Sequence, residues 1–242
     1  MKQIPYSSID LKKEDYKKIE KIIKSGWLAH GKASVSFEKT FCEFTQSQFA
    51  ITLSSCTAGL HLSCLALGIA KGDEVIVPAQ THAATAHSVE YTGAKAIFAD
   101  IDFETGNISI NEIVKKITSK TKAIIPVHMA GKSCDMKSII KIAKKYKLKI
   151  IEDCAHALGT HYQNTHVGNF GITGVFSFYP TKQITTGEGG MLITNNKKIF
   201  DKIKKLKAFG VNTPPEKRIK QSYYDINYLG FNYRMTDFQA QM

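Results

Sequence analysis

Apolar residues occur along this chain in two patterns. Short runs of them are typical of strands, and longer segments in which they recur at helical spacing are typical of helices. Seven short runs, rich in β-branched or other apolar residues, predict buried strands. These runs are 49–53, 74–77, 96–99, 122–127, 149–153, 175–179 and 190–194. The longer segments between them predict helices. These segments are 11–25, 34–44, 59–67, 82–91, 109–117, 135–146 and 197–209. Strands alternating with helices favour an α/β fold, with a mainly parallel seven-stranded sheet between helices.

Several helix ends are marked by the residues expected there. Gly26 follows the first amphipathic segment and should stop that helix. The sequence S-I-N-E from Ser109 to Glu112 predicts a capping box. Thr236 is a suitable N-cap for a last helix that starts near Asp237.

Composition limits the class of protein. The chain has 242 residues, of which 43% are hydrophobic, enough for one large domain. No run is long enough to span a membrane, and the start lacks the apolar segment of a secretory signal, so we expect a soluble, cytoplasmic protein. Five cysteines lack CxxC spacing, which favours free thiols over a disulfide framework or a zinc site.

The charge is strongly positive without indicating nucleic acid as a partner. Lys and Arg number 33 against 21 Asp and Glu, for a net charge of +12. The lysines are spread over predicted helices without interleaved aromatic residues, so a solvated surface is favoured over a nucleic-acid interface. A positive field would still steer a phosphorylated substrate toward the protein.

One lysine stands in a polar turn between two apolar strands. Lys182 lies near Ser177, Thr181, Thr185 and Thr186, and the turn ends in G-E-G-G. An amine enclosed between apolar strands is desolvated, which lowers its pKa toward the reactive neutral form. This is the setting of a Schiff-base lysine, and a solvated surface lysine is the alternative.

Other polar residues lie at or just after predicted strand ends. The stretch from Ser54 to Ala58 joins a strand to a helix, and suits either a phosphate dianion or ordinary capping. His82 follows another strand, and Asp153 ends the strand K-I-I-E-D. Ligands collect at strand ends in such sheets. The Asp153 carboxylate should therefore either join a structural hydrogen-bond network or face a cation.

Eight short motifs occur in one order over almost the whole chain. They are Ser25-Gly26-Trp27 with Gly31, Ser54 to Leu60, Gly72 to Pro78, Pro126-Val127-His128, Glu152 to Ala157, Phe176-Ser177-Phe178 with Lys182, Gly187 to Gly190, and Asn232 to Met235. Together they resemble the DegT/DnrJ/EryC1/StrS family of sugar-nucleotide aminotransferases, which use pyridoxal 5'-phosphate (PLP). The sequences of several short segments are most similar to the branch that makes 4-amino-4,6-dideoxy-N-acetylhexosamine nucleotides for pseudaminic-type sugars.

The resemblance implies a fold and a domain organisation. The fold would be the large domain of a type I aminotransferase, the PLP-dependent transferase fold. Residues 1–235 would form this PLP-binding domain with an N-terminal helical segment. Residues 236–242 would begin a helix leading to a small C-terminal domain that is absent from these 242 residues, and an exposed apolar face is expected where that domain would dock.

The resemblance also implies roles for individual residues. Lys182 would hold PLP as a Schiff base and move the proton in the reaction, Asp153 would pair with the pyridine nitrogen, and His156 would approach the phenolic oxygen. Further cofactor contacts would come from Cys56, Thr57, Ala58 and Ser177 to the phosphate, from His82 stacked on the ring, and from Asn232 of a neighbouring subunit. A homodimer with shared active sites follows from this last contact.

The implied reaction is amino transfer in two halves. An amino acid, with L-glutamate the expected donor, would give its amino group to the cofactor, and a nucleotide-linked 4-keto-6-deoxy sugar would accept it. Two alternatives stay open. A related sugar dehydratase is disfavoured because such relatives carry histidine in place of Lys182. A catalytically silent fragment that binds PLP or dimerises is the other.

Overall fold

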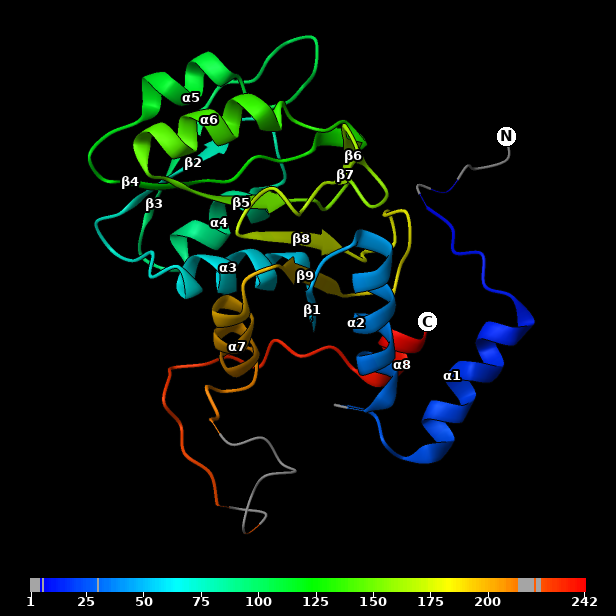
Figure 1. Cartoon of the computed structure of the whole chain (residues 1–242). Helices are drawn as coiled ribbons and strands as arrows, with labels where there is room; N and C mark the ends of the chain where they lie inside the picture. The colour runs from blue at the N-terminus through cyan, green and yellow to red at the C-terminus, as the bar shows by residue number, and fades with distance from the viewer. Residues whose placement is uncertain (1–4, 6, 30, 213–219, 221–222) are drawn as a thin grey trace.

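A seven-stranded sheet forms the centre of the computed structural model, which describes residues 5, 7–29, 31–212, 220 and 223–242 (Figure 1). The strand order is β1-β9-β8-β5-β4-β2-β3. The strands are β1 (Phe49–Leu53), β2 (Glu74–Pro78), β3 (Lys95–Ala99), β4 (Thr121–Ile124), β5 (Lys149–Asp153), β8 (Thr173–Ser177) and β9 (Gly190–Thr194). The α/β fold class predicted from the sequence is confirmed.

Six of these strands run in the same direction. The pairs β2/β3, β2/β4, β4/β5 and β5/β8 are parallel. Strand β9 is antiparallel to both β8 and β1, so β1 again points the same way as β8. The carboxyl ends of all strands except β9 therefore meet at one edge of the sheet, where α/β proteins bind their ligands.

Helices cover both faces of the sheet. They are α1 (Lys13–Ser25), α2 (Lys32–Thr45), α3 (Cys56–Ala66), α4 (Ala83–Glu90), α5 (Ile110–Lys116), α6 (Met136–Tyr146), α7 (Lys197–Leu206) and α8 (Asp237–Gln241). One apolar cluster joins α3, α4 and α7 to the sheet, whereas α5 and α6 pack on the opposite face (Figure 1). Helix α2 packs beside them over β1, β8 and β9.

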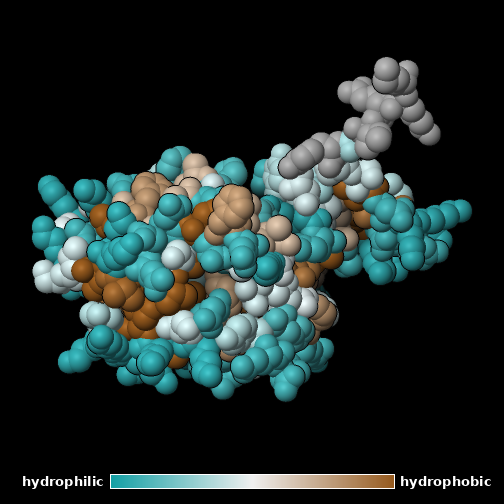
Figure 2. Space-filling model, turned by 90° about the horizontal axis from the view of Figure 1, so that it is seen from above, coloured by the Kyte–Doolittle hydropathy of each residue, from teal (hydrophilic) through white to brown (hydrophobic). Residues whose placement is uncertain are grey.

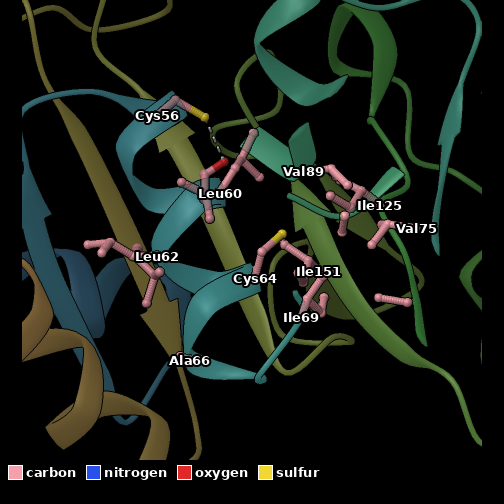
Figure 3. Packing of buried hydrophobic residues seen from close by; sticks show 14 of the residues in the cluster. Cys56, Leu60, Leu62, Cys64, Ala66, Ile69, Val75, Val89, Ile125 and Ile151 are labelled. Atoms are coloured by element: carbon pink, nitrogen blue, oxygen red, sulfur yellow. Dashed lines mark hydrogen bonds between the residues drawn. The ribbon is translucent and has the colours of Figure 1, made fainter. Parts of the chain in front are cut away.

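The alternation of side chains along each strand explains these layers. On β2, Val75 and Val77 belong to the cluster under α3, and Ile76 between them belongs to the cluster under α6. Leu60 and Cys64 of α3 lie against the sheet in this cluster, with Cys56 at the start of the same helix (Figure 3). The core therefore fixes α3 on the sheet and sets the position of its first turn.

Several element bounds differ from the sequence prediction, and four of these differences have a clear physical reason. Helix α3 starts at Cys56, three residues earlier than predicted, because Ser55 caps it. Strand β4 stops before Pro126, which has no N–H for the ladder. Strand β8 lies two residues earlier than predicted, where it pairs with β5. Helix α7 stops at Leu206 because the backbone groups after it form hydrogen bonds with the last part of the chain. Phe209 N, for example, donates to the Phe231 carbonyl at 3.0 Å.

The predicted capping box at α5 is half wrong. Ser109 is the N-cap, and its Oγ accepts from Glu112 N at 3.4 Å. The Glu112 carboxylate, however, accepts from Lys115 Nζ at 2.6 Å. Ser109 N donates instead to the Asp100 carbonyl at 2.9 Å, so the reciprocal bond of a capping box is absent from this helix. The other two predicted ends agree: Gly26 ends α1 with φ of +69°, and Thr236 is the N-cap of α8.

Two short strands were missed. β6 (His161–Tyr162) and β7 (Thr165–His166) pair antiparallel through a turn in which Gln163 has a φ of +54°. The wording Y-Q-N-T lacks the glycine that usually marks such a hairpin.

Hydrophilic residues cover much of the face shown in Figure 2, with apolar groups in patches between them. Large apolar side chains are also exposed in the described residues, among them Trp27 and Leu229.

The five cysteines are free thiols, as predicted. Within the described part of the chain, none of the helices has both the length and the apolar character needed to cross a membrane.

Candidate active site

A cavity of about 1100 Å³ opens at the carboxyl edge of the sheet. Its lining brings together most of the residues that the sequence analysis singled out, either at strand ends or through the family resemblance. They are Cys56, Thr57, His82, Asp153, His156, Ser177 and Lys182. They come from different strands and loops, so the parallel sheet is what assembles them.

The loop that carries Lys182 joins β8 to β9. Its backbone is held close to the strands, by bonds from Lys182 N to the Tyr179 carbonyl (2.9 Å) and from Thr186 N to the Phe178 carbonyl (3.1 Å). The Gln183 side chain also donates to the His156 carbonyl at 2.5 Å. Among the described residues, no hydrogen bond or ion pair engages Lys182 Nζ. The loop thus fixes the backbone and leaves the amine available.

Glycine at the end of this loop permits a close approach of β9 to α3. A Cβ on Gly190 would lie 2.5 Å from the Ser55 carbonyl carbon and 2.6 Å from Cys56 N. Both are backbone atoms that cannot move independently of the first turn of α3. The last glycine of the G-E-G-G stretch is therefore a packing requirement at the wall of the cavity.

The Lys182 amine is partly desolvated. Burial lowers the pKa of the Lys182 ammonium from its ordinary value, and the nearby Cys56 and Asp153 act in the opposite direction. Burial is the largest of these effects, so the neutral, nucleophilic amine is favoured relative to a surface lysine.

Asp153 ends β5 and is 4% exposed. Its Oδ2 accepts from Thr85 Oγ1 at 2.8 Å, and its Oδ1 accepts from Ala155 N at 3.1 Å. The Cys56 thiol also points to Oδ1, with a distance of 3.9 Å from Sγ. The hydrogen-bond network expected for this carboxylate is confirmed. Asp153 also lines the same cavity as Lys182, and a contact with a cation there stays a prediction.

Two imidazoles also border the cavity. Burial lowers the pKa of His156, with a further decrease from Lys182, so its neutral form is favoured. His156 Nδ1 is buried without a hydrogen-bond partner among the described residues. His82 caps α4, where its Nδ1 accepts from Ala84 N at 3.2 Å, which leaves Nε2 as the protonated nitrogen of the neutral ring.

The first turn of α3 forms another part of the wall. Ser55 Oγ accepts from Ala58 N at 3.0 Å, so ordinary capping of this helix is confirmed. Ala58 therefore has its amide engaged and is outside the lining of the cavity. Cys56 and Thr57 remain at the helix amino end, where amide hydrogens and the helix dipole favour an anion.

Asn232 lies outside this cavity. It is exposed, and its Oδ1 accepts from Arg234 Nε at 2.9 Å. Its implied role toward a second subunit stays a prediction.

Thr85 was missed by the sequence reasoning. It is completely buried in the first turn of α4 and bonded to Asp153. Thr81, which lines the cavity, is 2.8 Å from it, oxygen to oxygen. The segment from Thr81 to Thr85, T-H-A-A-T, contains only common residues, so nothing in the sequence indicated this contact.

A second buried polar cluster lies behind the site. His128, Glu152 and Cys154 have ligand-type atoms within 4.8 Å of one another. Glu152 accepts from three backbone amides, Gly168 N (2.8 Å), Phe170 N (2.8 Å) and Gly171 N (2.6 Å), and is 3.1 Å from His128 Nε2. His128 Nδ1 accepts from Cys134 N at 3.0 Å. These bonds commit the His128 ring and the Glu152 carboxylate to holding the fold together.

Comparison with known proteins gives a consistent result. The model of the DegT/DnrJ/EryC1/StrS aminotransferase family matches residues 9–242. GDP-perosamine synthase of Escherichia coli O157:H7 is 43% identical over 241 residues, which cover 99% of this chain and 64% of that protein. The chain spans about three fifths of the length of the curated relatives that it matches.

Solved structures agree with the fold. Helicobacter pylori PseC, an aminotransferase involved in the biosynthesis of pseudoaminic acid, superposes with a TM-score of 0.91 and 34% identity, covering 99% of this chain and 64% of that chain. Spr1654 from Streptococcus pneumoniae in its PLP-form gives a TM-score of 0.91 and 29% identity, covering 98% of this chain and 64% of that one.

Proposed function

Because the chain belongs to the DegT/DnrJ/EryC1/StrS aminotransferase family, we propose that its cavity binds PLP and serves a sugar-nucleotide aminotransferase. The reaction would transfer an amino group from an amino acid, L-glutamate, to a nucleotide-linked 4-keto-6-deoxy sugar. The observation that carries the proposal is that Lys182 and Asp153, which follow different strands, line one cavity together.

The residues of the cavity fit this cofactor. PLP needs an amine for its aldehyde, an anion for its pyridine nitrogen and donors for its phosphate. Lys182 supplies an amine without a partner among the described residues, and Asp153 supplies a buried carboxylate. The amino end of α3 supplies donors, and the unpartnered His156 Nδ1 is a polar atom that a ligand oxygen would satisfy.

When bound, PLP supplies an aldehyde that exchanges amines and a ring that takes up electrons. Lys182 would hold the cofactor through Nζ and would also act as base and acid through this atom, a role that its lowered pKa favours. Asp153 would hold the proton on the pyridine nitrogen. Buried carboxylates need such a partner to remain ionised at low cost.

The remaining implied contacts complete the proposal. Cys56, Thr57 and Ser177 would bind the phosphate, and His82 would cover the ring. Asn232 would reach the phosphate of a second copy, which makes the expected assembly a homodimer. A cytoplasmic location is part of the same prediction.

The relatives support the class of acceptor. Among those reported above, one is a GDP-perosamine synthase, and another works in pseudoaminic acid biosynthesis. Both names join an amino sugar to this family, and the local wording of the chain favours a pseudaminic-type acceptor. The cavity volume of about 1100 Å³ leaves room for a substrate beside a cofactor.

Visible absorption tests the proposal. PLP added to the purified protein should give the band of a lysine-bound cofactor, and L-glutamate should bleach it. Lys182→Ala should abolish the band, whereas Lys197→Ala, at an exposed site on α7, should retain it. A band that persists in Lys182→Ala would refute the assignment of the lysine. A band that no amino donor bleaches would favour the silent PLP-binding fragment.

A further inference from the structure

The Asp153 carboxylate is held by a chain of two hydroxyls. Thr85 Oγ1 is 2.8 Å from Asp153 Oδ2, and Thr81 Oγ1 is 2.8 Å from Thr85 Oγ1. Thr85 donates its single hydroxyl proton to Asp153 Oδ2. Thr81 must therefore donate to Thr85. The three groups have one consistent direction of hydrogen bonding, from Thr81 through Thr85 to Asp153.

Both carboxylate oxygens are thereby held. Oδ2 is held by Thr85, whereas Oδ1 is held by Ala155 N at 3.1 Å. The single proton of the Cys56 thiol is shared between Oδ1, 3.9 Å from Sγ, and the Val175 carbonyl, 3.7 Å from Sγ. A carboxylate has about four acceptor positions, so two full donors and the shared thiol leave at least one position for a further donor. Asp153 lines the cavity, so a ligand can provide that donor.

Thr85 itself does not line the cavity. It is fully buried on α4 and acts on the site only through the carboxylate. We propose that Thr85, supported by Thr81, is a positioning residue that fixes Asp153 for its contact with the pyridine nitrogen of PLP. The inference rests on the proposed function, since it concerns the carboxylate assigned to that nitrogen.

The variant Thr85→Val keeps the shape of the side chain and removes its donor. A hydrogen bond to a charged group is worth enough to change an affinity by roughly 10- to 100-fold. We therefore expect the Kd for PLP, measured by absorption titration of the cofactor-free protein, to rise by about that factor. Thr85→Ser keeps the donor and should bind almost as tightly as the wild type. Thr81→Val removes only the second hydroxyl and should show a smaller rise.

A matched control separates positioning from general loss of stability. Thr173→Val is the same substitution at a fully buried threonine, whose Oγ1 donates to Ser63 Oγ (2.9 Å) away from the cavity. Thermal melting of the cofactor-free proteins should show comparable losses for Thr85→Val and Thr173→Val. Only Thr85→Val should weaken PLP binding and shift the absorption of the bound cofactor.

The outcomes are distinct. If Thr85→Val binds PLP as tightly as Thr173→Val, Thr85 has only a structural role and the inference is overturned. If Thr85→Val does not fold, Thr81→Val decides, and an unchanged Kd there overturns the inference. A wild-type protein that takes up no PLP would overturn the proposed function itself, and this inference with it.

Discussion

The amino end of α2 is capped by a residue 206 positions away in the sequence. Its N-cap, Gly31, has no side chain. Asp237, at the start of α8 and only 2% exposed, supplies the acceptor instead. Its Oδ1 accepts from Gly31 N (2.9 Å) and Ser34 Oγ (2.6 Å), and its Oδ2 accepts from Ala33 N (3.3 Å). This carboxylate therefore joins the start of α2 to the start of α8.

The substitution Asp237→Asn should test the strength of that junction. The amide has the same shape but no charge, and it has one acceptor oxygen where the carboxylate has two. One bond is lost and two change from charged to neutral, each at a cost near 1 kcal/mol. Loss of the favourable interaction with the helix dipole adds a few tenths. We expect the free energy of unfolding to fall by roughly 2–4 kcal/mol.

Urea unfolding followed by circular dichroism measures this change, provided that the m-value stays constant. Asp201→Asn is the matched control. Asp201 is half exposed and paired with Lys197 on the surface of α7, so its substitution should cost under about 1 kcal/mol. If Asp237→Asn and Asp201→Asn unfold at the same urea concentration, Asp237 does not act as the cap of α2.

Three further predictions concern other buried contacts. Gly190→Ala should lower stability by about 1–3 kcal/mol and weaken PLP uptake, since the new Cβ would meet the backbone of Ser55 and Cys56. The control Gly68→Ala, at a glycine that faces open space, should leave PLP uptake unchanged. Glu152→Gln should cost at least about 3 kcal/mol in urea unfolding, because three backbone amides lose their charged acceptor; a loss under about 1 kcal/mol would contradict that role. Burial lowers the folded-state pKa of His61, so protonation favours the unfolded chain and stability should fall as the pH drops below about 6.5; His61→Gln should flatten this pH dependence, and an unchanged slope would assign it to other groups.

The sheet could be predicted because its signals are local. The strands 49–53 and 190–194 were predicted with the bounds that the structure shows, since each is a short apolar run beside polar residues. Asp153 and Lys182 could be placed near each other by one further argument, that the carboxyl ends of parallel strands share an edge. Their chemical roles came from the family resemblance.

Contacts between distant residues could not be predicted in the same way. Thr85 lies 68 positions from Asp153, and Asp237 lies 206 positions from Gly31. In the sequence, nothing distinguishes Thr85 or Asp237 from the threonines and aspartates that lie on the surface. The start of α3 was placed too late for a related reason, because Ser55, Cys56 and Thr57 are as common in loops as in helix caps.

The short helix α8 connects the capped end of α2 to the cavity. Gln239 Nε2 donates to the Glu188 carbonyl at 2.7 Å, and a Cβ on Gly189 would lie 2.6 Å from Met235 Cε. The Lys182 loop thus rests on the segment that Asp237 anchors to α2. Because this support reaches the backbone of the loop and not Lys182 Nζ, weakening it should alter the position of the amine while its chemistry stays intact. Asp237→Asn should therefore slow the formation of lysine-bound PLP at saturating cofactor, whereas Asp201→Asn should leave that rate unchanged. Equal rates in the two variants would show that the loop keeps its conformation without α8.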